Sequence, residues 1–243
     1  MLAGDYVRRA IPEFIGTFAL IFVGAGSALY GDVVGIAFAN GLVIAVMVSG
    51  FAMISGGFFN PAVTLGFLVT RRISGPLAVV YWLAQFGGAA VAALLLNWVL
   101  PASARNEIKL GVPALHTGIT DGKGMVIEAV LTFFLVWVVF ATAVDPRGTF
   151  KQIAGLAIGL TITMDALMAA GLTGAAMNPA RAFGPQLVGH VWSHWWIWYV
   201  GPFAGAAIAA LLYEALYLGP ERVEPAGPEP DVDEPAVGTA ALQ

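Results

Sequence analysis

Hydrophobic residues gather in six long stretches, and polar residues are confined to the short segments between them. The stretches cover residues 11–30, 33–54, 76–100, 125–144, 153–170 and 195–218. Each approaches the length of about 20 residues that a helix needs to cross the hydrocarbon core of a bilayer. Because lipid satisfies no backbone polar group, a crossing segment must be a helix or belong to a closed barrel, and barrel strands are alternating segments of about ten residues. The pattern therefore predicts an all-α membrane protein with six transmembrane helices.

Composition agrees with this prediction and narrows the function classes. Of the 243 residues, 59% are hydrophobic and 11% are charged, whereas about 25% are charged in an average soluble domain. The chain has no cysteine, which excludes disulfides, thiol catalysis and thiolate metal sites. The sequence also lacks a nucleotide-binding motif, a metal-ligand cluster and a nucleophile–base arrangement. We therefore expect no enzyme activity, no cofactor or metal, and no nucleic-acid partner.

The two ends of the chain differ from its middle. Residues 1–10 contain no small-residue cleavage site, so we expect the first stretch to be a retained helix and not a signal peptide. Residues 219–243 hold six acidic residues, one arginine and five prolines, a composition typical of a disordered tail. The domain prediction is one membrane domain over residues 1–218, followed by this acidic, proline-rich tail.

The distribution of cationic residues predicts the orientation. Six spans place both termini on one side of the membrane, together with seven cationic residues: Arg8, Arg9, Arg71, Arg72, Arg147, Lys151 and Arg222. Three lie on the other side: Arg105, Lys109 and Lys123. Because lysine and arginine are in excess on the cytoplasmic side, both termini are expected in the cytoplasm. We expect a multi-pass protein of the cell (plasma) membrane.

One motif occurs twice and divides the chain into halves. It stands at Asn60-Pro61-Ala62 and again at Asn178-Pro179-Ala180, with the two asparagines 118 residues apart. Glu13 in the first stretch and Glu128 in the fourth are separated by 115 residues, which reinforces the repeat. A membrane chain that repeats itself with a broken segment in matching places points to a transport site between its halves.

The motif segments are too short to cross the membrane. Residues 61–69 and 179–188 correspond to about 14–15 Å of helix each. Asparagine is a favoured N-cap and proline a favoured first helical residue, so each segment is expected to begin a half-helix. With three spans per half, inverted repeats at about residues 6–100 and 124–218 would bring these half-helices together, N-terminus to N-terminus, at mid-membrane. That geometry predicts a pore.

These features resemble the aquaporin (major intrinsic protein) family over about residues 6–218. Residues 13–18 and 201–205 resemble the family's first- and sixth-helix signatures, and residues 141–146 and 177–185 are most similar to the tonoplast intrinsic proteins. The resemblance implies a six-helix hourglass with two half-helices, assembled as a homotetramer with one pore per subunit.

The resemblance also implies roles for individual residues. Asn60 and Asn178 would present side-chain NH2 donors to a passing oxygen, while the positive ends of the two half-helices oppose a cation at the centre. Arg181 would add a full positive charge at the outer constriction, the alternative being an arginine that reaches the membrane interface. Glu13 and Glu128 are expected to be structural, holding the carbonyls of the half-helix loops.

The remaining residues of the selectivity filter follow from their spacing to the two asparagines. The family's filter positions correspond here to Asn40, Ala166, Ala175 and Arg181, and a shift of the register by one residue would place Phe38 or Gly41 nearby. Water-selective members carry an aromatic residue and a histidine at the first two places. Glycerol facilitators carry two aromatics there and an aspartate where this chain has Ala182. Two alanines predict a wider constriction that does not select strictly for water.

Several polar residues remain open at this stage. His116, in the outer loop, resembles a loop histidine of relatives that pass ammonia, or is an ordinary exposed residue. Asp165 is a functional candidate because it is ionisable within a span, or it pairs with a backbone or hydroxyl group behind the pore. A cluster near the sixth stretch is expected to form an interfacial belt: His190, Trp192, His194, Trp195, Trp196, Trp198 and Tyr199.

The expected function is a passive channel for water that also admits small neutral solutes such as ammonia, urea or glycerol and excludes protons and ions. The alternative is a dedicated channel for urea, glycerol or a metalloid hydroxide, with water incidental. A coupled transporter would need an ionisable relay in the pore, for which Asp165 alone is available.

Overall fold

The computed structural model describes residues 3–148 and 151–219. This part of the chain consists of helices and connecting loops, without a strand. Six of its helical segments are long and apolar enough to cross a membrane: Gly4–Leu29, Val33–Ser55, Gly75–Val99, Asp121–Val144, Ala154–Thr173 and Ile197–Leu218. The prediction of six transmembrane helices is confirmed. The predicted acidic tail lies outside the described residues, apart from Gly219.

The first helix begins earlier than its hydrophobic stretch predicts. Helix α1 (Ala3–Ala19) starts eight residues before the predicted bound at residue 11. Its first turns carry Asp5, Arg8 and Arg9, and arginine is a good helix former. A helix can continue into water beyond its hydrophobic stretch, so hydrophobicity alone marks the part in lipid and not the end of the helix.

The first helix of each half ends in a π-helical turn. Helix α1 passes into η1 (Leu20–Ala25) and the short 3-10 helix η2 (Gly26–Tyr30). Helix α6 (Asp121–Val139) passes into η4 (Phe140–Val144) in the same way. The sequence repeat is therefore reproduced in the backbone. The last span also ends in a π-helical turn, with α9 (Ile197–Tyr213) followed by η6 (Glu214–Leu218).

The other spans are uninterrupted α-helices. These are α2 (Val33–Ser55), α4 (Gly75–Val99) and α7 (Ala154–Thr173). Between α4 and α6 lie a short helix, α5 (Ala102–Ile108), and a 3-10 turn, η3 (Lys109–Gly111), which the hydrophobic pattern does not predict. A further 3-10 turn, η5 (Lys151–Ile153), precedes α7.

Both predicted half-helices are present. Helix α3 spans Pro61–Val69, as predicted, and α8 spans Pro179–Gly189, one residue longer than predicted. In each, the asparagine is the N-cap and the proline the first helical residue. Each half-helix packs against the last span of the other half, α3 against α9 and α8 against α4. The two halves therefore interlock.

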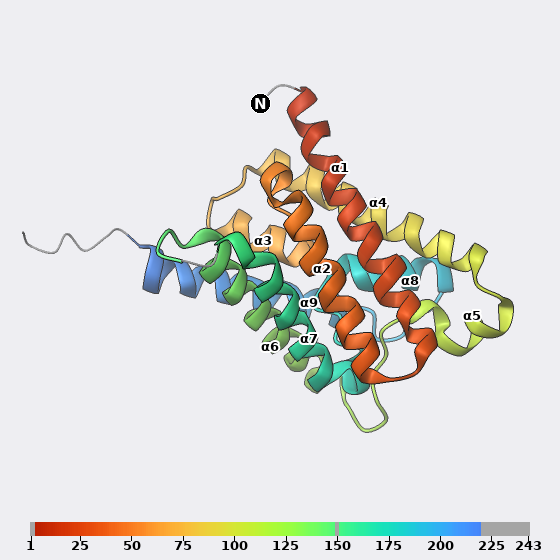
Figure 1. Cartoon of the computed structure of the whole chain (residues 1–243). Coiled ribbons are helices and arrows are strands. Elements are labelled where there is room, and N and C mark those ends of the chain that lie inside the picture. Colours follow the sequence, from red (N-terminus) through yellow and green to blue (C-terminus); the bar gives the residue numbers. More distant parts are fainter. Residues whose placement is uncertain (1–2, 149–150, 220–243) are drawn as a thin grey trace, which may run out of the picture.

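Matching helix pairs build the two halves, and a third pair joins them. Helix α1 packs on α4 and α6 on α9, while α2 and α7 lie side by side between the halves (Figure 1). At the α2–α7 crossing, a Cβ on Gly41 would collide with the carbonyl of Gly159, and the reverse is also true. Small residues let membrane helices approach closely, so this glycine pair fixes the junction of the repeats.

Candidate functional site

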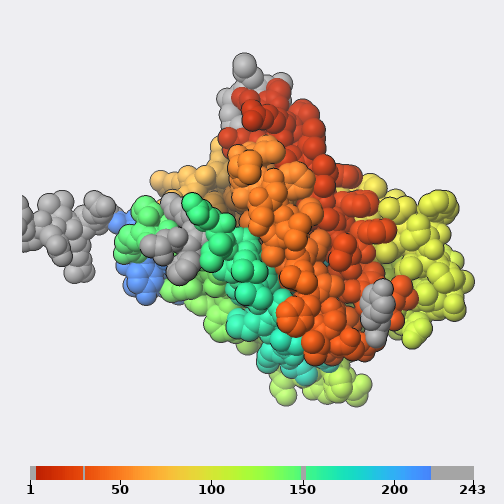
Figure 2. Space-filling view, in the orientation of Figure 1, coloured from red at the N-terminus to blue at the C-terminus, as the bar shows by residue number. Residues whose placement is uncertain are grey.

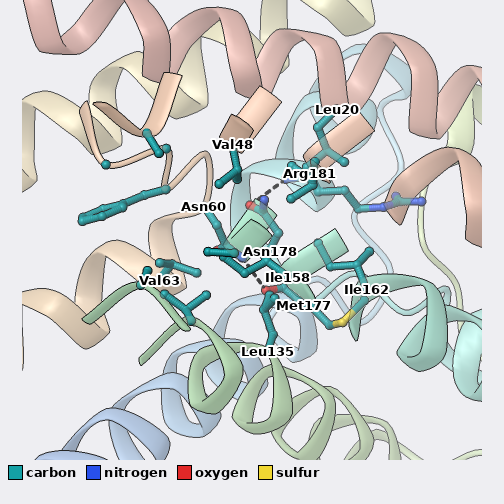
Figure 3. A pocket seen from close by; sticks show the side chains of 18 of the residues that line it. Leu20, Val48, Asn60, Val63, Leu135, Ile158, Ile162, Met177, Asn178 and Arg181 are labelled. Carbon is teal, nitrogen blue, oxygen red and sulfur yellow. Dashed lines mark hydrogen bonds between the residues drawn. The ribbon is translucent and has the colours of Figure 1, made fainter. Parts of the chain in front are cut away.

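A cavity of about 280 Å³ lies where the two repeats meet. It is lined by residues of η1, α2, α3, α6, η4, α7 and α8 and of both loops that lead into the half-helices. Most of the wall is apolar, including Val48, Ile158 and Leu135, and polar groups from the two motifs project into it (Figure 3). In such a mostly apolar cavity, a passing water molecule can form hydrogen bonds with the wall only at these few polar groups.

The two motif loops are tied to each other by their asparagines. The side-chain Nδ2 of Asn60 donates to the carbonyl of Met177 at 2.9 Å, and Nδ2 of Asn178 donates to the carbonyl of Phe59 at 2.9 Å. An amide NH2 carries two N–H groups. One N–H of each asparagine is therefore used to join the loops, and the second remains for the cavity that both residues line.

The same asparagines cap the half-helices. Oδ1 of Asn60 accepts from the amide of Ala62 at 2.8 Å, and Oδ1 of Asn178 accepts from the amides of Ala180 and Arg181 at 3.0 and 3.2 Å. A helix N-terminus carries about half a positive charge. Two such ends meet at the cavity, one from each side. This arrangement favours a neutral oxygen acceptor over a cation.

Glu13 and Glu128 hold the two loops in matching ways. The carboxylate of Glu13 accepts from the Ser55 hydroxyl at 2.7 Å and from the amides of Phe58 and Phe59 at 3.0 and 2.7 Å. The carboxylate of Glu128 repeats this arrangement, accepting from the second loop's hydroxyl and amides at 2.7, 3.0 and 2.8 Å: Thr173, Ala176 and Met177. Both carboxylates are fully buried.

The prediction that these glutamates hold the loop carbonyls is therefore wrong in its chemistry. A carboxylate is an acceptor and binds N–H and O–H donors, not carbonyl oxygens. Phe59 and Met177 have left-handed backbone conformations, with φ values of 49° and 52°. The hydrogen bonds from their amides to the glutamates hold these strained conformations in place. The carbonyls of these two residues accept from the asparagines, so the glutamates position them indirectly.

An aromatic side chain from the last span of each half donates a hydrogen bond to the start of the motif loop of that half. The sequence did not indicate these two contacts. The Tyr81 hydroxyl donates to the carbonyl of Ser55 at 2.5 Å, and Nε1 of Trp198 donates to the carbonyl of Thr173 at 2.9 Å. Trp198 is 1% exposed, so its assignment to an interfacial belt is wrong. Trp198 is close in sequence to exposed tryptophans, but it lies on the buried face of α9, which the sequence cluster does not reveal.

The rest of the predicted belt lies nearer the surface. Trp192 and Trp195 are 40% and 49% exposed. Nδ1 of His194 lies 2.7 Å from Oδ1 of Asp121. The Tyr199 hydroxyl donates to the Gln186 side chain at 3.1 Å. These contacts link the segment before α9 to the start of α6, and the first turn of α9 to the last turn of α8.

Arg181 is buried beside the cavity and is held from the outer loop. Its Nη1 donates to the carbonyl of Gly111 at 2.6 Å, and the residue lines the cavity (Figure 3). Gly111 has a φ of 72°, and a Cβ there would meet Ala25. Sequence reasoning missed Gly111, because its role depends on a backbone carbonyl. The η3 turn thus positions the arginine's charge.

Of the other predicted filter residues, Asn40 and Ala175 line the same cavity as Arg181, while Ala166 is not among the residues that line it. Phe38, the alternative to Asn40, is 43% exposed on the outer surface. Nδ2 of Asn40 donates to the carbonyl of Ile36 at 2.8 Å. Its amide is therefore engaged by the helix backbone.

The two open candidates lie outside this cavity lining. The backbone amide of His116 donates to the carbonyl of Leu172 at 2.8 Å, but its ring is exposed and lies 2.7 Å from the carbonyl of Thr117. Asp165 is 2% exposed, and its Oδ2 has no hydrogen-bond partner among the described residues. The expected backbone or hydroxyl partner for that oxygen is therefore not found there.

The loop between η4 and α7, within the second repeat, is fixed by one carboxylate. Asp145 accepts from the Arg147 side chain at 2.9 and 2.6 Å, and from the Tyr213 hydroxyl at 2.9 Å. The Arg147 guanidinium holds the pKa of Asp145 well below its ordinary value. This contact joins the end of η4 to α9, next to Val144, which lines the cavity.

Comparison with known proteins gives one consistent family. The family model described as Major intrinsic protein matches residues 3–213. The chain is 41% identical over 232 residues to "Probable aquaporin TIP3-2" of Arabidopsis thaliana, covering 88% of this chain and 85% of that protein. It is 41% identical over 241 residues to "Aquaporin TIP4-4" of Zea mays, covering 93% of each.

A solved structure supports the fold. The X-ray structure of the aquaglyceroporin from Plasmodium falciparum superposes with a TM-score of 0.79 at 24% sequence identity, covering 87% of this chain and 96% of the other.

Proposed function

The chain belongs to the major intrinsic protein family, and we propose that it is a passive channel that conducts water and small neutral solutes while excluding protons and ions. It is a transporter and not an enzyme. The observation that carries this proposal is the reciprocal asparagine pairing in a mostly apolar cavity. Relatives named as aquaporins support the same function.

The proposed route uses the free N–H of each asparagine. A water oxygen at the centre accepts from Asn60 and Asn178, whose other N–H groups are held by the opposite loops. The adjoining half-helix ends orient their positive dipoles toward the same point. Pore diameter, lining donors and electrostatic barriers together set selectivity in such channels. A cation meets these dipoles and the charge of Arg181, so it is excluded.

We assign the filter to Asn40, Ala166, Ala175 and Arg181, with His116 as a further candidate. The small side chain of Ala175 on the cavity wall, together with Ala166, which the family resemblance adds to the filter, supports the passage of urea, glycerol or ammonia besides water. Asn40 and Ala175 lie on the wall of the cavity that Arg181 also lines. The comparisons favour water with small solutes over a dedicated solute channel.

The domain organisation, assembly and location complete the proposal. Residues 1–218 form one channel domain, and four copies assemble as a homotetramer, as the family resemblance implies. The chain is an integral multi-pass membrane protein. We place it in the cell membrane with both termini cytoplasmic, supported by the seven cationic residues on that side. Chemical cross-linking in native membranes tests the tetramer, and a ladder that stops at the monomer contradicts it.

Stopped-flow light scattering of proteoliposomes tests the function. Vesicles that contain the purified chain should shrink faster than empty vesicles under a sorbitol gradient, and should refill faster with urea, glycerol or ammonia. A variant with Asn178→Leu, which removes one pore donor and one loop link, is the matched negative control. Refilling without faster shrinking would favour the dedicated solute channel.

A further inference from the structure

A second cavity, of about 500 Å³, lies beside the pore between the start of α1, the end of α2 and the start of α4. Its lining includes Arg9, Arg72, Ser74 and Tyr81. Phe58 lines both this cavity and the pore. The orientation proposed above places this second cavity at the cytoplasmic face. Channel function assigns it no role.

The charged residues of this lining are both arginines, and no carboxylate lines the cavity among the described residues. Arg9 lies beside the Tyr81 hydroxyl. Arg72 pairs with Glu214 through Nε and Nη2 at 2.8 and 2.9 Å, which fixes its guanidinium and leaves Nη1 for another acceptor. The cavity therefore presents two guanidinium groups from different segments, and the pair with Glu214 orients that of Arg72 while offsetting its charge.

Neither of the two acidic residues next to Arg9 on α1 lines the cavity. On α1, Asp5 stands one turn before Arg9 and Glu13 one turn after it. The carboxylate of Glu13 is fully buried and accepts four hydrogen bonds, the fourth from Nε2 of Gln85 at 2.8 Å. The hydrogen-bonding capacity of the Glu13 carboxylate is therefore used by these four donors and not by Arg9. Asp5 is not part of the cavity lining.

The start of α4 adds to the positive character of the site. Ser74 is the N-cap of this 25-residue helix, and its side chain makes no capping hydrogen bond. Pro76 has no N–H and the amide of Ala78 donates to the carbonyl of Ser74, so the amides of Gly75 and Leu77 and the Ser74 hydroxyl remain for an anion, which helix N-termini favour. Together with the two arginines, these donors match a phosphate group, which arginine binds through parallel N–H donors.

The position of the cavity's mouth points to an occupant with an acyl chain. Met53 lines the cavity and is 83% exposed near the end of α2, a helix long and apolar enough to cross a membrane. In Figures 1 and 2 the start of α1, the end of α2 and the start of α4 gather at one end of the molecule, in the upper part of the view. The mouth therefore opens at the membrane interface.

We propose that this cavity binds the phosphate of an anionic lipid headgroup from the cytoplasmic leaflet. Basic pockets between transmembrane helices on the cytoplasmic side are suited to such headgroups. Arg9, the free Nη1 of Arg72 and the start of α4 contact the phosphate, and Met53 contacts the acyl chains. Because Phe58 separates this site from the pore, a bound headgroup stabilises the loop that leads into α3.

Native mass spectrometry of the full-length chain in detergent tests the proposal with two matched variants. Arg8 and Arg9 are adjacent and both exposed, but only Arg9 lines the cavity. With dioleoyl phosphatidylglycerol as probe, Arg9→Gln should weaken binding about fivefold, the usual contribution of one arginine near an anionic lipid surface. Arg8→Gln should leave binding within twofold of the wild type. Equal loss in both variants, or loss in neither, overturns the proposal.

Two further probes separate the possible sources of the phosphate. Dioleoyl phosphatidylcholine, which has the same chains and no net charge, should bind more weakly than the anionic lipid. Glycerol 3-phosphate, a headgroup without chains, should bind at least tenfold more weakly. If glycerol 3-phosphate binds as tightly as the lipid, the site takes a soluble anion and the lipid assignment is wrong. Thermal unfolding without lipid should be the same for both variants, since both arginines are exposed.

Discussion

At the scale of single residues, Arg181 is buried, and a hydrogen bond to a loop carbonyl holds its guanidinium beside the pore. Nη1 is 2.6 Å from the carbonyl of Gly111. Arg181→Ala should remove the full charge while the two half-helix dipoles remain, so water flow persists and proton or small-cation leak rises. Dissipation of a pH gradient in proteoliposomes measures the leak. A leak equal to that of the wild type would count against this role for Arg181.

Filter width is also decided by single side chains. Asn40 uses an amide N–H on its own helix backbone, and Ala166 and Ala175 contribute little bulk. The double substitution of Asn40→Phe with Ala166→His should narrow the outer pore. It should lower urea, glycerol or ammonia flux by a larger factor than water flux, as compared by stopped-flow light scattering.

The control for this prediction is Phe38→Leu, because Phe38 lies on the exposed surface and should change neither flux. If the wild-type channel already excludes all three solutes, the argument from two small filter residues is wrong.

At the scale of elements, the half-helix loops depend on buried carboxylates. Glu128 accepts a hydroxyl and two amides of the second loop. Glu128→Gln replaces one acceptor oxygen by a donor, so at least one buried loop donor loses its partner. Loss of a hydrogen bond to a charged group costs about 2 kcal/mol. We expect a lower thermal unfolding temperature and a loss of water flux together.

Glu214→Gln is the matched control for this carboxylate. Its pair with Arg72 is about one-third exposed, and such surface pairs contribute about 0–1 kcal/mol. It should therefore unfold close to the wild-type temperature and keep its flux. Equal effects of the two substitutions would show that loop amides do not depend on Glu128.

The loop between η4 and α7 carries a pH-dependent contact. Arg147 holds the pKa of Asp145 below its ordinary value, which is about 3.9 in an unfolded chain. A lowered folded-state pKa contributes stability above the unfolded pKa, and this stability is lost as the pH falls through the folded value. Asp145→Asn should therefore unfold at a lower temperature than the wild type at pH 7 and pH 5. The difference should shrink below about pH 4. A difference that does not depend on pH would contradict this account.

At the scale of the whole molecule, the inverted repeat explains why so much of the fold could be predicted. Hydrophobic length gave the six spans, and the Asn-Pro-Ala spacing gave α3 and α8 with nearly correct bounds. Both signals are local in the sequence. Where the helix continues past its hydrophobic stretch, as α1 does over Asp5 and Arg9, the local signal fails.

The remainder of the site depends on contacts between distant residues. The carbonyl of Gly111 that accepts from Arg181 is a backbone group, so the residue type at this position does not predict the contact. Trp198 and Tyr81 perform equivalent roles in the two halves with different chemistry, an indole N–H and a phenol hydroxyl. A sequence comparison of the halves therefore does not pair them. The donor groups on Glu13 and Glu128 follow from tertiary packing, which spacing alone does not define.

The central claim is that paired asparagines and opposed half-helices admit water while rejecting protons. Its most direct test is to measure water and proton flux in the same preparation of wild-type proteoliposomes, by light scattering and by an internal pH-sensitive dye. The account predicts water flux well above that of empty vesicles, with a proton leak equal to theirs. Water flux no greater than that of empty vesicles, or water flux accompanied by a matching proton leak, would contradict it.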